Sequence, residues 1–280
     1  SFSSFIAAGI RLSSGTGHRV FYNTVHLFSN TSVSATTPTN PISTAFYVSS
    51  TVVTGISVRN NIFSNKMTST FSGFRAFAVL FPSSYNFSTA LNTINHNSYN
   101  IPATPTATTS YFVGSLSTAA TLYPTLTSWR AVTFGDANSV PTVNANVPFA
   151  NDSTMQLPAG TPSELESGGA VLTGAGLSTP NTDIVGLLRP AFAGTAPDMG
   201  AYEFDGIPSD FTPPVISYTD LTNTGSTANR PFTVTITDPS LIGNGVNAPR
   251  FYFKKASDPN TFVTNNSAFS GRSEEHTSEL

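Results

Sequence analysis

The chain has 280 residues, a formal net charge of −3 and only 10% charged residues, against about 25% in typical globular proteins. It has no cysteine, which excludes disulfide bridges, thiolate metal sites and thiol nucleophiles. The low, scattered charge predicts no nucleic-acid partner, and no apolar run approaches the ~20 residues of a membrane-spanning helix.

The first 135 residues contain no aspartate or glutamate, and the first carboxylate of the chain is Asp136. This stretch carries six cations, Arg11, Arg19, Arg59, Lys66, Arg75 and Arg130. General acid–base catalysis usually uses His, Asp or Glu, most glycosidases need a carboxylate pair, and calcium sites are built mainly from carboxylates. The stretch by itself therefore favours binding or a structural role over catalysis.

Two short strands recur along this stretch. The first is expected near residues 10–12, 46–48 and 77–79, and the second near 20–25, 58–63 and 94–99. The second strand carries the motif apolar-x-x-Asn-x-apolar, whose asparagines Asn23, Asn61 and Asn97 are 38 and 36 residues apart. A repeat of this length predicts a β-solenoid over residues 1–150, in which each strand pairs with its counterpart in the next repeat.

The three asparagines are expected to form one structural column, an Asn ladder. Asparagine tolerates a left-handed backbone at a sharp bend, and stacked amides can bond the backbone of the neighbouring repeat. The alternative is that these amides bind sugar.

Five segments carry a resemblance to a known family. They are GISVRNNIFSN at 55–65, the segment 129–140 with Trp129 and Asp136, LPAGTPS at 157–163, and the pair DIVGLLRP at 183–190 and PDMGAYEF at 197–204. Together they resemble the right-handed parallel β-helix repeat proteins of the pectin-lyase-like superfamily, over roughly residues 1–206. The resemblance implies an all-β fold with a short helix and connector at 129–140 and a closing segment at its end. Val185 departs from the family pattern, in which an acidic residue is common.

The remaining chain predicts a second module. A linker at 207–214 precedes segments 215–218, 232–238 and 250–255, which alternate polar and apolar residues with the spacing of a β-sandwich. They resemble the Ig-like modules that follow β-helices in secreted bacterial proteins, and residues 215–271 are short for such a module, which needs ~100 residues. Residues 272–280, RSEEHTSEL, resemble a translated sequencing adapter and are expected to be a foreign tail. The natural N-terminus is expected upstream of Ser1.

One dense charged cluster is present, formed by Asp183, Arg189, Asp198, Glu203 and Asp205. We expect it to be an ion-paired plug that covers the open end of the solenoid and its unpaired strand edge. The alternatives are a calcium site, or a sugar-binding or catalytic site. His18, His26 and His96 have no carboxylate or thiolate neighbour in these repeats, so no zinc site is expected. No catalytic residue is assigned, and calcium is the one cofactor left open.

Arginine and aromatic side chains are the candidates for ligand binding. Arg11, Arg19, Arg59 and Arg75 are positioned to grip uronate carboxylates if they share one face. In the pairs Phe21-Tyr22 and Phe46-Tyr47, one ring of each is expected inside and one outside. Outward Tyr22 and Tyr47, with Arg19 and Arg59, are the predicted carbohydrate-binding residues, and a packing role for the rings is the alternative.

These features predict part of a secreted or surface-attached bacterial protein that binds polysaccharide or acts in adhesion without catalysis. One alternative is the C-terminal part of a polysaccharide lyase or glycoside hydrolase whose active repeats lie upstream. Another is a structural stalk with no ligand. Fold alone does not choose among them.

Overall fold

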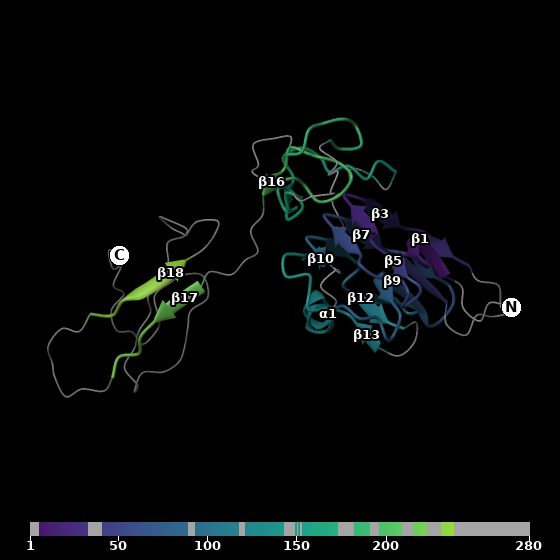
Figure 1. Cartoon of the computed structure of the whole chain (residues 1–280), viewed down its shortest axis with the longest axis horizontal. Coiled ribbons are helices and arrows are strands. Elements are labelled where there is room, and N and C mark those ends of the chain that lie inside the picture. Colours follow the sequence, from purple (N-terminus) through teal and green to yellow (C-terminus); the bar gives the residue numbers. More distant parts are fainter. Residues whose placement is uncertain are drawn as a thin grey trace. The chain divides into compact units, whose positions relative to one another are not determined.

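The computed structural model describes residues 6–32, 41–88, 93–117, 121–142, 149, 151, 153–172, 182–190, 196–208, 215–222 and 231–237. Contacts divide the chain into a first unit, Ser1–Ser209, and a second unit, Asp210–Leu280. Strands make up most of the regular secondary structure of the described residues, which contain one α-helix (Figure 1). None of their helices is long and apolar enough to cross a membrane.

The first unit is built from successive repeats. Repeat 1 contains β1 (Ile6–Leu12), β2 (Arg19–Phe21), β3 (Thr24–Leu27) and β4 (Asn30–Thr31). Repeat 2 contains β5 (Ile42–Val48), β6 (Ser57–Arg59), β7 (Ile62–Asn65) and β8 (Thr68–Ser69). Repeat 3 contains β9 (Phe74–Phe81), β10 (Thr93–Asn95) and β11 (Ser98–Asn100). Repeat 4 contains β12 (Thr109–Leu116), β13 (Thr121–Tyr123), α1 (Leu126–Thr133) and β14 (Val140–Thr142).

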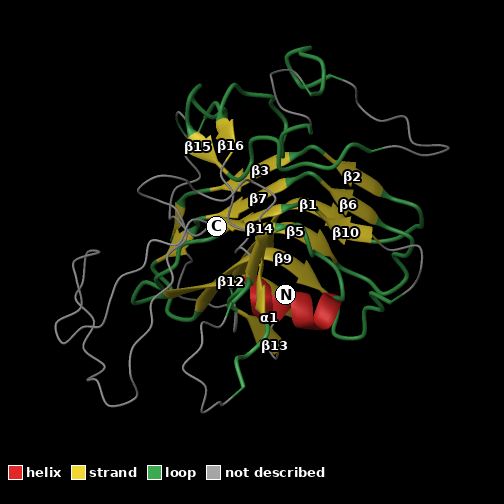
Figure 2. Ribbon diagram, turned by 90° about the vertical axis from the view of Figure 1, so that its left-hand side faces the viewer, coloured by secondary structure: helices red, strands yellow, loops and turns green. Residues whose placement is uncertain are grey.

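Equivalent strands of successive repeats pair in parallel and form three larger sheets (Figure 2) and the two-stranded sheet β4-β8. The first sheet has the order β1-β5-β9-β12-β13, in which only β13 is antiparallel. The second sheet is β2-β6-β10 and the third is β3-β7-β11-β14. In the second and third sheets, the paired residues of repeats 1 to 3 are 38 and 36 residues apart, which is the spacing of the three asparagines. In the first sheet, the paired residues of successive repeats are 36, 33 and 35 residues apart.

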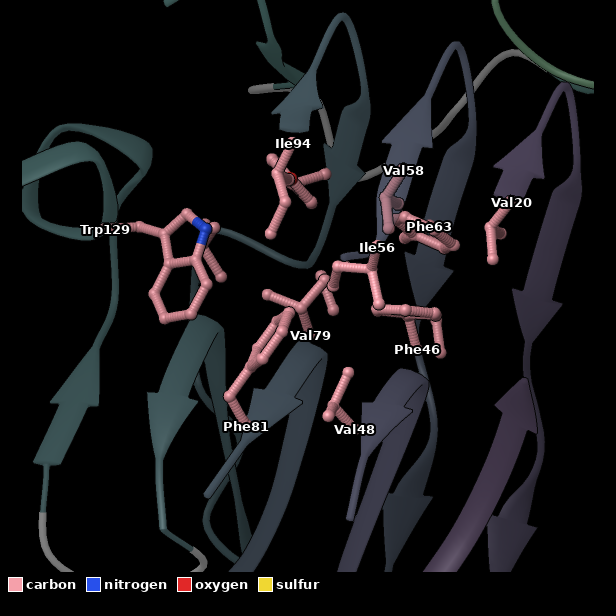
Figure 3. Packing of buried hydrophobic residues seen from close by; sticks show 14 of the residues in the cluster. Val20, Phe46, Val48, Ile56, Val58, Phe63, Val79, Phe81, Ile94 and Trp129 are labelled. Carbon is pink, nitrogen blue, oxygen red and sulfur yellow. The ribbon is translucent and has the colours of Figure 1, made fainter. Parts of the chain in front are cut away.

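The core lies between the sheets. Val20, Val58 and Ile94 occupy one register position on the second sheet and point inward (Figure 3). Phe46 and Phe63 stack at a centroid distance of 5.3 Å between the first and third sheets. Each repeat thus contributes apolar residues at equivalent positions, and the core extends by stacking.

The Asn ladder runs along the bend between the second and third sheets. The amide N–H of Asn23 donates to Asn61 Oδ1 at 2.9 Å, and the amide N–H of Asn61 donates to Asn97 Oδ1 at 3.1 Å. Asn61 Nδ2 also donates to the carbonyl oxygens of Val20 and Arg59. The ladder therefore satisfies backbone groups that the bend between strands leaves unpaired.

The left-handed residue at this bend is not the ladder asparagine, as the sequence interpretation had it, but its predecessor. Tyr22, Asn60 and His96 have φ values of 55°, 60° and 53°. The ladder asparagines instead use their side chains to bridge repeats. We call Tyr22, Asn60 and His96 the bend column.

The ladder ends on Asp136. Asn97 N–H donates to Ser139 Oγ at 2.9 Å, and Ser139 Oγ donates to Asp136 Oδ1 at 2.6 Å. Tyr99 Oη and Trp129 Nε1 also donate to this carboxylate, which is fully buried. The first acidic residue of the sequence is therefore a structural acceptor where the repeat pattern stops.

The helix α1 overlaps the segment 129–140 for which the resemblance implied a helix, but it begins three residues earlier, at Leu126. Thr125 caps its N-terminus through a capping box with Ser128. The turn that follows lies beside the second sheet, because Asp136 N–H donates to the carbonyl of Ile94 in β10 at 2.8 Å. The helix and turn thus stand where repeat 4 would place its second-sheet strand.

Trp129 occupies space that Gly114 leaves free on β12. A Cβ atom at Gly114 would lie 2.3 Å from Trp129 Cε3, and Trp129 is fully buried. We expect Gly114→Ala to lower the free energy of unfolding by about 1–3 kcal/mol, as overpacking does. Urea unfolding followed by circular dichroism measures it. The cost should shrink in a Trp129→Leu background, and an equal cost in both backgrounds would contradict this packing.

The second unit contains β17 (Val215–Tyr218) and β18 (Val234–Thr237), which pair antiparallel. They match two of the three strands expected there. The expected strand at 250–255 and the tail at 272–280 lie outside the described residues.

Candidate functional site

The outer face of the second sheet carries the arginine face, which we define as the outward positions of β2, β6 and β10. Because Val20, Val58 and Ile94 point inward, the residues that flank them point outward. These residues are Arg19, Phe21, Ser57, Arg59, Thr93 and Asn95. All six are partly or fully exposed.

The strand register orders this face in two rows. Phe21, Arg59 and Asn95 form one row, and Arg19, Ser57 and Thr93 form the other. Arg59 Nε donates to Ser57 Oγ at 3.0 Å. An aromatic ring thus lies one strand away from a guanidinium held by a hydroxyl, with no carboxylate in any of the three strands.

The predicted carbohydrate-binding residues do not all meet on this face. Arg19 and Arg59 share it, whereas Tyr47 lies on β5 of the first sheet beneath Arg11, whose Cζ is 5.4 Å from the ring centroid. Arg75 also lies on the first sheet, in β9. The four arginines therefore do not share one face.

The expectation that Tyr22 points outward is wrong. Its exposed fraction is 8%, and its hydroxyl donates to the carbonyl of Ala170 at 3.3 Å. The guanidinium of Arg189 lies over its ring at 4.2 Å. The bend after Phe21 reverses the alternation, so that Phe21 is the outward ring of the pair.

The segment after residue 149 packs on the outer surface of the third sheet. Ile62 of β7 joins a buried cluster with Leu157, Leu165, Met199 and Phe204. Two short strands of this segment, β15 (Pro162–Ser163) and β16 (Ile207–Pro208), pair in parallel. We call the described residues of 163–206 the closing segment.

The closing segment is hydrogen-bonded to the bend column. Asn60 Nδ2 donates to the carbonyl of Ala170 at 2.8 Å, and Ala170 N–H donates to Asn60 Oδ1 at 2.9 Å. His96 Nδ1 lies 3.2 Å from the carbonyl of Gly168. These contacts reach repeats 1, 2 and 3, so the segment lies along the side of the stack.

This location corrects the expected role of the charged cluster. Its ion pair, Arg189 Nη1 to Glu203 Oε1 at 2.5 Å, does form and is almost fully buried. Arg189 also donates to the carbonyls of Gly200 and Ala201, whose own contacts are with Asn60 and Thr24. The cluster therefore fastens the closing segment to the bend column and the third sheet rather than covering the open end of the stack.

The carboxylates of the closing segment accept hydrogen bonds from backbone N–H groups. Asp183 accepts from Val185, Leu187 and Glu203. Asp198 Oδ1 and Oδ2 accept from Ser167 and Phe204, each at 2.7 Å. Asp205 is exposed and outside this network. The carboxylate oxygens of Asp183 and Asp198 are therefore already engaged as hydrogen-bond acceptors within the closing segment.

Burial raises the pKa of three carboxyl groups of the first unit, those of Asp198, Glu164 and Asp136. It raises the pKa of Asp198 to about 7, against the hydrogen bonds from Ser167 and Phe204 and with the help of nearby Glu203 and Glu166. It raises the pKa of Glu164 to about 7, and Glu164 Oε2 is buried without a hydrogen-bond partner. Burial also raises the pKa of Asp136 to about 6, against its three side-chain donors and Asn97.

The histidines His18, His26 and His96 occupy different environments. His18 Nε2 lies 2.8 Å from the carbonyl of Ser14, whereas His96 is in the bend column, so the two are not a pair on one sheet. His26 Nδ1 lies 2.8 Å from Ser64 Oγ on the third sheet. Within the described ranges, no three His, Asp or Glu side chains are grouped to hold a metal ion.

Sequence reasoning missed two contributors to these surfaces and one exposed aromatic side chain. Phe21 was placed inside, Asn60 was read only as part of a repeat, and Phe134 was not considered. Phe134 is 83% exposed, has a left-handed backbone at the end of α1, and lies in the turn beside β10. An exposed aromatic ring in such a conformation is visible only in the tertiary structure.

Comparison of the chain with protein families, curated proteins and solved structures finds no match.

Proposed function

We propose that this chain is part of a secreted or surface-attached, right-handed parallel β-helix with a partial Ig-like module, and that it binds an acidic polysaccharide without catalysis. The ligand lies on the arginine face. Arg19 and Arg59 pair with its carboxylates, and Phe21 packs against a sugar ring. The hydroxyl and amide groups of Thr93 and Asn95 contact its hydroxyl groups.

One observation carries this proposal: Arg19, Phe21 and Arg59 are brought to one exposed face by the register of β2 and β6. Guanidinium groups bind carboxylates through charge-assisted hydrogen bonds, and an aromatic ring supplies an apolar surface for a sugar. The strands contribute no acidic side chain to repel a polyanion.

The non-catalytic part of the proposal rests on the use of the carboxylates. In the described closing segment, Asp183 and Asp198 accept backbone hydrogen bonds, and Glu203 is paired with Arg189. A lyase or hydrolase needs a base or acid free to meet the substrate, and the six residues of the arginine face include no Asp, Glu or His. The alternative of a structural stalk with no ligand predicts no polysaccharide binding, so a binding measurement distinguishes it from this proposal.

Arg59→Gln is expected to weaken binding of polygalacturonate about threefold to tenfold, which corresponds to about 1 kcal/mol, the range of an exposed charge pair. Isothermal titration calorimetry on the full chain measures it. Binding should also weaken as salt is added, because exposed charges are screened. Neutral dextran should bind equally to both proteins.

Arg11→Gln is the matched control, because it removes the same charge from an exposed position on the first sheet. An equal loss in both variants would remove the arginine face as the site and leave only a net-charge effect. Formation of unsaturated uronate, followed by its ultraviolet absorbance on the same samples, would overturn the non-catalytic assignment.

A further inference from the structure

The side chain of Asn95, on the arginine face, is fixed by two backbone groups. Its Oδ1 accepts from the N–H of His96 at 2.9 Å and from the N–H of Asn138 at 2.8 Å. His96 belongs to the bend after β10, whereas Asn138 lies in the turn between α1 and β14. The amide of Asn95 is therefore held from its own repeat and from repeat 4.

These two hydrogen bonds decide which end of the amide is available to a ligand. A backbone N–H is a donor, so only the carbonyl oxygen of an amide side chain can meet it, and two N–H groups occupy both lone pairs of that oxygen. Among the described residues, Nδ2 of Asn95 has no hydrogen-bond partner, and the side chain is partly exposed. Asn95 thus offers a ligand two donor hydrogens and no acceptor.

The guanidinium of Arg59 is directed away from Asn95, toward the other row of the face. Arg59 and Asn95 are register partners on β6 and β10, but Arg59 Nε donates to Ser57 Oγ at 3.0 Å. Ser57 and Asn95 are one strand and two residues apart, which is about 8 Å in a parallel sheet. A single sugar unit whose carboxylate binds Arg59 beside Ser57 can therefore extend its other substituents to Asn95.

The substituents of a uronate other than its carboxylate are hydroxyl groups. A hydroxyl oxygen accepts from an N–H donor, whereas the same oxygen in an acetyl ester is bulkier and a poorer acceptor. A site built to hydrogen-bond one group of a sugar discriminates against analogues in which that group is changed, because its own polar group is then left unpaired.

We propose that Asn95 is a specificity-determining residue of the arginine face: its Nδ2 donates to a hydroxyl oxygen of the uronate whose carboxylate Arg59 binds. The face then selects acidic polysaccharides with free secondary hydroxyl groups over their O-acetylated forms. This inference rests on the proposed function, because it requires the carboxylate on Arg59. It adds a selectivity that charge cannot supply, since O-acetylation leaves every carboxylate in place.

Isothermal titration calorimetry of the full chain with polygalacturonate, and with the same polymer O-acetylated, tests the proposal. The unsubstituted chain should bind the acetylated polymer about threefold to tenfold more weakly, the effect of one hydrogen bond at a partly exposed position. Asn95→Ala should weaken binding of the free polymer by a similar factor and leave binding of the acetylated polymer unchanged. Circular dichroism and Trp129 fluorescence check that the variant keeps its fold.

Asn138→Ala is the matched control. It removes the contact of the Asn138 side chain with His96 Nε2, at 3.2 Å, but keeps the backbone N–H that holds Asn95. The preference for the free polymer should persist in this variant. An equal loss for both polymers in Asn95→Ala would show that Asn95 only fastens the turn, and would overturn its role in specificity.

Arg59→Gln separates this inference from the function on which it rests. It should weaken both polymers by the same factor and keep the preference for the free one. If Arg59→Gln changes neither affinity, the arginine face is not the site and the proposed function fails. If it weakens both, but the unsubstituted chain binds the two polymers equally or the preference survives in Asn95→Ala, only the role of Asn95 is overturned. The comparison of the two polymers on the unsubstituted chain needs no variant to fold.

Discussion

Replacement of Asn61 by alanine is expected to lower the free energy of unfolding of the first unit by about 3 kcal/mol or more. Asn61 is fully buried and its side chain bonds both neighbouring repeats. The substitution removes the acceptor of the Asn23 N–H and a donor to the Val20 carbonyl, whereas the Arg59 carbonyl still accepts from Tyr22 N–H. A buried polar group that loses its partner costs about 1–3 kcal/mol. Trp129, the single tryptophan, reports on this unit in a urea titration followed by fluorescence.

Asn23→Ala is the matched control. Asn23 occupies the same column in repeat 1 but is partly exposed, and water can replace part of what its side chain supplies. We expect a loss of about 1 kcal/mol there. Similar losses in the two variants would show that the ladder does not stabilise the stack through the amide bonds described above.

The stability of the first unit is expected to increase as the pH falls from 8 to about 5. Burial raises the pKa of Asp136 from 3.8 to about 6, of Asp198 from 3.8 to about 7 and of Glu164 from 4.5 to about 7. A group whose pKa is higher in the folded state binds its proton more tightly there, so its stabilising contribution is present at low pH and is lost as the pH rises through 6 and 7. For buried Asp136 the loss is on the order of 3 kcal/mol.

Thermal unfolding at a series of pH values measures this effect, with the transition followed by Trp129 fluorescence. Glu164→Gln should flatten the part of the curve near pH 7 and stabilise the protein at pH 8, because Glu164 Oε2 is buried without a partner. Ser153→Ala, at an exposed position in the same unit, should leave the curve unchanged. A stability that rises from pH 5 to pH 8 would contradict the burial of these carboxylates as charged groups.

The pairing of counterparts between repeats could be predicted from the spacing of residues. The single strand expected near 20–25, 58–63 and 94–99 is instead two strands in different sheets, separated by the left-handed bend. Asn23, Asn61 and Asn97 recur at 38 and 36 residues, and a chain with that period aligns equivalent residues when its repeats stack. The same local pattern fixes the inward positions of Val20, Val58 and Ile94. The absence of acidic residues before Asp136 likewise follows from the sequence alone, and it limits the chemistry of the repeats.

Which side chains form the candidate site could not be predicted, because it depends on contacts between residues far apart in the sequence. Whether Phe21 or Tyr22 points outward is decided by a left-handed bend at Tyr22 and by Arg189, which is 167 residues further along the chain and covers the Tyr22 ring. Sequence reasoning grouped Asp205 with the four other charged residues of the cluster, although Asp205 lies outside their hydrogen-bond network. It also did not identify the surface against which the members of the cluster pack. Their partners are backbone N–H and C=O groups, which every residue carries, so only the tertiary structure decides which of them are brought within hydrogen-bond distance.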